Sequence, residues 1–161
     1  MIRRAAFLLV VAALAAVVAG PDSFTLTAQG TAGVAVRFEN VAAAAGVDFT
    51  HVNGATPERH LAEIMGGGGL FFDYNDDGWI DIFIVDGGSI TSPPTARRAR
   101  HRLFRNRGNG TFEDATAASG ITHSQYGIGA CSADYDNDGW VDLYITNVGP
   151  NVLLRNSGGR S

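Results

Sequence analysis

The sequence contains a single cysteine, Cys131, and no lysine, so all 12 of its basic residues are arginines. One cysteine cannot form an internal disulfide, and the apolar run around Cys131 predicts a small buried residue. With 16 acidic residues the formal net charge is -4; without Arg3 and Arg4, 10 basic residues face 16 acidic ones. An acidic chain of this kind is not expected to bind nucleic acid, and its stability must come from packing and bound metal.

Long apolar runs are scarce, and the one that stands out, residues 5–19, follows directly after two arginines at the N-terminus. This order is typical of an export signal cleaved at or just after Ala19. The run is short for a membrane span of roughly 20 residues, so a retained membrane anchor is the less favoured alternative. We therefore predict a signal peptide over residues 1–20 and a linker over 21–34. The mature protein would be periplasmic, secreted or otherwise extracellular, without a stable membrane span.

Two near-copies of one acidic loop dominate the rest of the chain: DYNDDGWID at residues 73–81 and DYDNDGWVD at residues 134–142. Each copy places a carboxylate or an amide at loop positions 1, 3, 5 and 9, and a glycine at position 6 that permits a sharp turn around a hard cation. We predict two Ca²⁺ sites. The expected side-chain ligands are Asp73, Asn75, Asp77 and Asp81 in the first loop and Asp134, Asp136, Asp138 and Asp142 in the second, with the backbone carbonyls of Trp79 and Trp140 completing the shells.

Other interpretations of the loops fit less well. An EF-hand requires a glutamate at position 12, where this sequence has Ile84 and Ile145. A plain polar turn would not repeat aspartate at positions 1, 5 and 9. The second loop offers four carboxylates against three in the first, so we expect it to bind Ca²⁺ more tightly, with affinities on the order of 10⁻⁴ to 10⁻³ M as in extracellular modules. Repulsion between the carboxylates should leave an empty loop mobile.

The loops belong to a longer internal repeat. At an offset of 61, residues 66–88 and 127–149 share ten identities, whereas residues 38–47 resemble 112–121 at an offset of 74. The difference means that the first unit holds 13 extra residues before residue 66. A third similarity is that between LFRNRG at residues 103–108 and LLRNSG at residues 153–158. We predict a first unit over residues 35–114 with an insertion at 52–65, and a second over 115–161, stacked as an array.

Within a unit the pattern predicts β-strands. Apolar and β-branched runs at residues 70–72, 80–85, 102–106 and 111–114 read as four strands, with an Asn-Gly turn before the last, and residues 141–146 repeat the second of them. Four short strands per unit form a β-propeller blade, and closure needs roughly four to eight blades. Because the second unit stops before its last strand, we expect the chain to be the N-terminal piece of a longer protein that supplies the remaining blades.

Four segments carry a family resemblance: FENVAAAAGVDFTHVNG, GGGGLFFDYNDDGWIDIFIVDGG, LFRNRGNGTFEDATAASGI and DYDNDGWVDLYITNVG. They resemble the VCBS/FG-GAP repeat family of calcium-binding propellers, and within it the bacterial ASPIC/UnbV-type proteins related to cartilage acidic protein. The resemblance to this subgroup rests on the N-terminal repeats alone. The resemblance implies an all-β propeller of about seven blades, of which this chain holds two incomplete four-stranded units. It also implies structural calcium, adhesion to or recognition of an extracellular protein or polysaccharide, and no catalysis.

Three further motifs suggest alternatives. His51, His60 and Glu63, in or beside the insertion, would suit a second metal or an acid–base site, and an enzyme with its site there or beyond Ser161 is the alternative function. An arginine-rich stretch would suit an acidic polysaccharide, although a solvated charged loop is the simpler explanation. Gly66 to Gly69 lack the strand, helix and lysine of a phosphate-binding loop, so close strand packing explains them better. The arginine-rich stretch comprises Arg97, Arg98, Arg100, His101, Arg102, Arg105 and Arg107.

Overall fold

The computed structural model of the chain describes residues 23–26, 36–90 and 98–158, so the predicted signal peptide lies outside the described residues. The chain forms two compact units, residues 1–41 and 42–161. In the first unit, β1 (Ser23–Leu26) pairs antiparallel with β2 (Val36–Glu39). Four residues of the predicted linker therefore form a strand.

Residues 42–161 contain two antiparallel sheets in which each strand pairs with the next along the chain. The first sheet has four strands and the second has three, and the short helix α1 (Leu61–Met65) lies in the predicted insertion. This architecture confirms the all-β fold class. It also confirms that the two predicted repeat units have the form of propeller blades, one with four strands and one with three. The strands are β3 (Gly69–Phe72), β4 (Asp81–Ile84), β5 (Arg102–Asn106) and β6 (Phe112–Asp114), then β7 (Gly127–Ala133), β8 (Asp142–Asn147) and β9 (Val152–Leu154).

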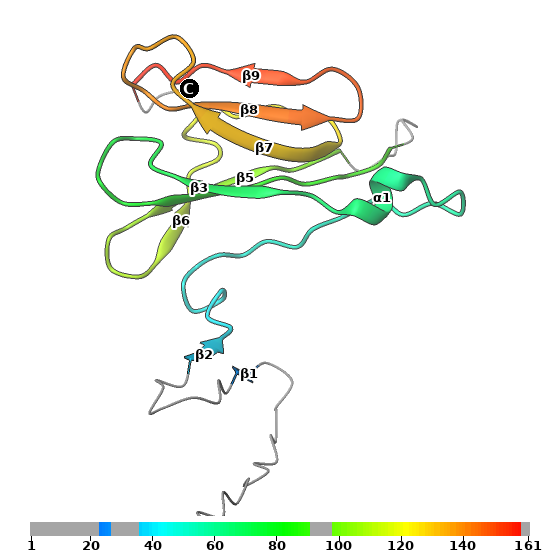
Figure 1. Cartoon of the computed structure of the whole chain (residues 1–161), viewed down its shortest axis with the longest axis horizontal. Helices are drawn as coiled ribbons and strands as arrows, with labels where there is room; N and C mark the ends of the chain where they lie inside the picture. The colour runs from blue at the N-terminus through cyan, green and yellow to red at the C-terminus, as the bar shows by residue number, and fades with distance from the viewer. Residues whose placement is uncertain (1–22, 27–35, 91–97, 159–161) are drawn as a thin grey trace, which may run out of the picture. The chain divides into compact units, whose positions relative to one another are not determined.

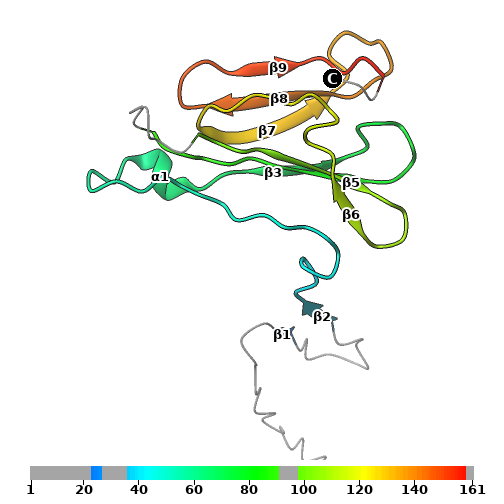
Figure 2. The same cartoon turned by 180° about the vertical axis from the view of Figure 1, so that it is seen from behind.

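The second sheet stacks on one face of the first, as both views show (Figures 1 and 2). Side chains that alternate along the strands fill the space between the sheets: Phe83 and Leu103 from the first, Leu143 and Ile145 from the second. Phe83 and Ile145 are fully buried. These side chains belong to the main apolar core of residues 42–161. Burying one side chain of this kind stabilises the fold by about 1.5–3 kcal/mol.

Close backbone packing at the edge where β3 meets β7 explains the glycine run. The Gly68 N–H donates to the carbonyl of Ile128 at 3.1 Å. A Cβ on Gly68 would lie 3.1 Å from the Cα of Gly129, and one on Gly67 would lie 2.3 Å from the carbonyl oxygen of Val85. The prediction of close strand packing is confirmed for Gly67, Gly68 and Gly69, whereas a Cβ on Gly66 would meet no atom within 4 Å.

Cys131 is exposed, so the prediction that it is buried was wrong. It pairs in register with Tyr144 on β8, whose neighbours Leu143 and Ile145 face the first sheet. Because side chains alternate along a strand, Cys131 and Tyr144 lie on the opposite face of the second sheet. The apolar run around Cys131 marked a strand, but not which face its cysteine would occupy.

The two acidic loops lie at the same end of the stacked sheets, and α1 lies at the other (Figures 1 and 2). The first loop joins β3 to β4 and the second joins β7 to β8. The insertion and residues 85–90, which follow β4, lie at the α1 end (Figures 1 and 2). The predicted metal ligands and the predicted histidine site are therefore on opposite ends of the unit.

We predict that Ile145→Ala lowers the free energy of unfolding by about 3 kcal/mol, because it leaves a cavity between the sheets. Urea denaturation of the whole chain measures this change. The matched control is Ile64→Ala on α1, where the isoleucine is 70% exposed. A loss at Ile64 as large as that at Ile145 would contradict the assignment of the core.

Candidate metal centre

The aspartate at loop position 1 closes each turn in the same way. The carboxylate of Asp73 accepts the N–H groups of Asp77 at 3.2 Å and Gly78 at 2.8 Å. In the second loop, Asp134 accepts the corresponding N–H groups at 3.0 and 2.9 Å. The loops share one geometry, which the common pattern of aspartate and glycine imposes.

Loop position 4 has left-handed backbone in both copies, with φ of 54° at Asp76 and 58° at Asn137. Aspartate and asparagine tolerate this conformation better than most residues. Both side chains are exposed. They lie between the predicted ligand positions 3 and 5 and are not members of the predicted ligand set.

The aspartate at loop position 9 is buried in both copies, with exposed fractions of 0% at Asp81 and 1% at Asp142. Asp81 accepts the backbone N–H of Tyr74 at 3.1 Å and that of Asn106 at 2.7 Å. Asp142 accepts the equivalent N–H groups of Tyr135 and Asn156 at 3.0 and 2.7 Å. Burial raises the pKa of Asp81, although these hydrogen bonds favour its charged form.

An arginine contacts the predicted acidic ligands of each loop: Arg105 on β5, and Arg155 directly after β9. The guanidinium of Arg105 lies 3.2 Å from Asp77. That of Arg155 lies 2.7 Å from Asp136 and 2.8 Å from Asp138. The sequence analysis did not foresee that these arginines, and the asparagines that follow them, contact the acidic loops. The Arg-Asn pair that occurs in both repeats was the sequence signal that could have identified them.

The oxygens of the second loop fit a cation. Carboxylate oxygens of Asp134, Asp136 and Asp138 all lie within 4.8 Å of one another, and Ca²⁺ prefers such an all-oxygen set. Asp142, the fourth predicted carboxylate, is not part of this group. Its role as a ligand, like that of the Trp140 carbonyl, stays a prediction.

A different observation supports a cation site in the first loop. The side-chain oxygen of Asn75 is buried and has no hydrogen-bond partner. An unpaired buried oxygen is costly, and a bound cation would satisfy it. The amide nitrogen of Asn75 donates to Asp77 at 2.9 Å, and this hydrogen bond is the main cause that lowers the pKa of Asp77. The ligand roles of Asp73, Asp81 and the Trp79 carbonyl stay predictions.

The structure does not assemble His51, His60 and Glu63 into one group of metal-ligating atoms among its described residues. Glu63 is buried and accepts hydrogen bonds from the N–H and hydroxyl of Thr56 and from the N–H of His60. Burial alone would raise the pKa of Glu63, but these hydrogen bonds outweigh it and lower the pKa. Glu63 therefore holds the insertion in shape.

His51 instead lies against Asp86, with Nδ1 3.6 Å from the buried carboxylate. Asp86 also accepts the N–H groups of Val52 and Arg100 at 2.9 Å each. Nearby, His101 is 2% exposed, and its Nδ1 accepts the Asp86 N–H at 3.1 Å. Its ring stacks on that of His123 with centroids 5.5 Å apart. Sequence reasoning did not foresee this cluster, because its members lie far apart along the chain.

The arginine-rich stretch is largely engaged in ion pairs. Arg102 lies 3.3 Å from Asp114, and Arg107 lies 2.7 Å from Glu113. Arg105 contacts Glu113 at 3.6 Å in addition to Asp77. Arg98 and Arg100 are exposed, and Arg97 lies outside the described residues. The arginines of β5 and its turn are therefore balanced by carboxylates of the same sheet.

Burial, together with the neighbouring His123, lowers the pKa of His101 to about 4, so the folded protein keeps it neutral while the unfolded chain protonates it near pH 6.5. We therefore predict that the free energy of unfolding falls by about 2 kcal/mol from pH 7 to pH 5 through this group. His101→Asn, which keeps an acceptor for the Asp86 N–H, should flatten this slope in denaturation curves. His60→Asn, on the exposed start of α1, is the control, and an unchanged slope in His101→Asn would contradict the prediction.

Within the described part of the chain, no helix combines the length and apolar character needed to cross a membrane. The profile of the FG-GAP-like repeat matches residues 73–145. Human cartilage acidic protein 1 is 48% identical over 53 residues, and the mouse protein is 46% identical over 53 residues. In each case the match covers 32% of this chain and only 8% of the relative's length. The chain therefore carries an FG-GAP-like repeat, which runs from the first acidic loop to the core strand β8.

Proposed function

We propose that this chain is part of a secreted, calcium-binding repeat module that recognises or adheres to an extracellular partner. The observation that carries the proposal is the matched pair of acidic loops. One brings three carboxylates within 4.8 Å of one another, and the other holds a buried amide oxygen without a partner. A hard cation would satisfy the unpaired oxygen of the first loop, and in the second loop it would add to the positive charge that Arg155 brings to Asp136 and Asp138.

In this proposal the calcium ion is structural: it supplies positive charge that holds the loop oxygens together. The chain's own residues already shape each loop without it. Asp73 and Asp134 close the turns, and the buried Asp81 and Asp142 anchor each loop to the strand that follows. A cation at loop positions 1, 3 and 5 would bind beside this anchor and share the carboxylates with Arg105 or Arg155.

Binding rather than catalysis is favoured because the candidate acid–base groups already have structural partners. Glu63 is held by Thr56 and the start of α1, and His51 lies against Asp86. The resemblance to adhesion repeats supports recognition of a protein or polysaccharide. An acidic polysaccharide bound by the arginine-rich stretch is a weaker alternative, since Arg102, Arg105 and Arg107 pair with carboxylates of their own sheet.

Calorimetric titration of residues 22–161 with Ca²⁺, alongside thermal melts in calcium and in chelator, tests the proposal. We expect two binding events and a higher melting temperature in calcium, because an ion that binds only the folded chain stabilises it. Asp73→Ala and Asp134→Ala should each remove one event. A chain that is folded by circular dichroism yet takes up no calcium would overturn the proposal.

The two loops also provide a reciprocal exchange at position 3. Asn75→Asp adds a fourth carboxylate to the first loop and should tighten its calcium binding roughly tenfold, whereas Asp136→Asn should weaken the second loop by a similar factor. Each variant serves as the control for the other, because both change one charge at the same place. Affinities that do not follow the carboxylate count would show that position 3 does not contact the ion.

A further inference from the structure

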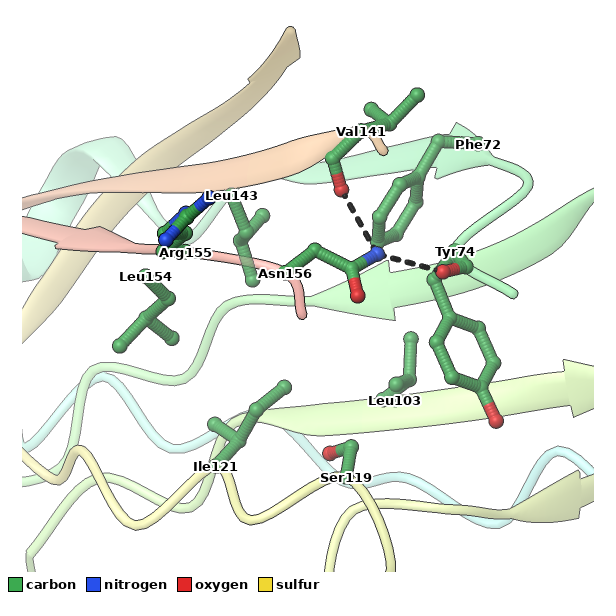
Figure 3. A pocket seen from close by; sticks show the side chains of 10 residues that line it. All are labelled: Phe72, Tyr74, Leu103, Ser119, Ile121, Val141, Leu143, Leu154, Arg155 and Asn156. Carbon is green, nitrogen blue, oxygen red and sulfur yellow. Dashed lines mark hydrogen bonds between the residues drawn. The ribbon is translucent and has the colours of Figure 1, made fainter. Parts of the chain in front are cut away.

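The side chain of Asn156, at the end of β9, connects the two acidic loops. Its amide nitrogen donates to the carbonyl of Tyr74 in the first loop at 2.7 Å and to the carbonyl of Val141 in the second at 3.1 Å (Figure 3). Its backbone N–H donates to Asp142 at 2.7 Å. Both amide protons are thus used, one on each loop.

On the first loop, the bond from Asn156 reaches a residue that adjoins two predicted ligands. Tyr74 follows Asp73, and its N–H donates to the buried carboxylate of Asp81 at 3.1 Å. The backbone of Tyr74 is therefore held on its N–H side by its own loop and on its carbonyl side by the second sheet. A shift of the first loop must move this carbonyl relative to Asn156.

The chain contains a natural comparison in Asn106, the equivalent residue of the first sheet. Its backbone N–H donates to Asp81 at 2.7 Å and its amide nitrogen donates to the carbonyl of Ile80 at 2.9 Å. Its side-chain oxygen accepts the N–H of Gly108 at 2.9 Å. All three contacts stay within the first sheet and its turns, so Asn106 supports one loop whereas Asn156 supports two.

We infer that Asn156 couples the two loops, so that each binds calcium more tightly when the other is filled. The inference rests on the calcium binding proposed above and concerns its regulation. An ion held by Asp134, Asp136 and Asp138 would restrain the second loop as far as Val141 and Asp142, and through their hydrogen bonds the amide and backbone of Asn156. With that amide fixed, the Tyr74 carbonyl loses less freedom when the first loop closes on its own ion. Because coupling free energies are reciprocal, the first ion must favour the second by the same factor.

The first test needs no change at Asn156. Calcium titrations followed by the amide resonances of Gly78 and Gly139, which donate to the position 1 aspartates, report each loop separately. We expect the first loop to bind about fivefold more weakly in Asp134→Ala than in the intact chain, and the second to weaken by a similar factor in Asp73→Ala. Equal affinities in the intact chain and the single-loop variants would overturn the coupling.

The second test assigns the coupling to Asn156. Asn156→Ala should leave both loops able to bind while reducing their affinities to those of the single-loop variants. Asn106→Ala is the matched control and should preserve the ratio between intact and single-loop affinities, even where it weakens the first loop. If Asn156→Ala does not fold, Asn156→Asp keeps the volume and removes both donors. A ratio that survives the loss of these donors would overturn the role of Asn156.

A third readout is independent of binding at the first loop. In Asp73→Ala, filling the second loop should slow amide hydrogen exchange over residues 74–81, and Asn156→Ala should abolish this protection. Unchanged exchange would contradict the coupling. If the intact chain takes up no calcium at all, the proposed function fails with it. If two ions bind independently, only the coupling fails, so the two results are distinguishable.

Discussion

The structure of the acidic-loop end depends on two buried carboxylates, Asp81 and Asp142. A buried carboxylate is costly unless hydrogen bonds compensate for its lost hydration, and each of these accepts two backbone N–H groups. One N–H comes from the start of the acidic loop and the other from the next strand of the sheet. The aspartate therefore ties the end of the loop to the pairing of two strands.

Around this anchor the two copies differ in ways that matter for charge. The second loop has an aspartate where the first has Asn75, and its arginine contacts two loop carboxylates where Arg105 contacts one. An additional negative charge and an additional ion pair thus occur together in the second loop. In the first loop, Asn75 supplies both a donor to Asp77 and an unpaired oxygen. In each loop a positive charge is needed close to the carboxylates to offset their mutual repulsion, and either a guanidinium or a metal ion can supply it.

Much of this organisation could be predicted from local sequence. The acidic loops, their outward-facing position 4, the glycines at β3, the four strands of the first sheet and β8 all follow from short-range patterns of polar, apolar and turn-forming residues. Prediction failed or was silent where distant segments meet. The exposed face of Cys131 and the burial of His101 beside Asp86 and His123 depend on which sheet face or chain segment lies opposite.

The sequence by itself therefore determined the chemistry of the loops, because alternation along a short turn decides which oxygens can converge. Only the tertiary structure decided how the loops are connected. Asn156 is 82 residues from Tyr74 and reaches it because the second sheet stacks on the first. Its counterpart, Asn106, has the same local sequence of Arg and Asn yet bonds only within its own sheet. The local sequence pattern is the same in the two copies. Because the second sheet stacks on the first, Asn156 bonds to both loops, whereas Asn106 bonds to the first loop alone.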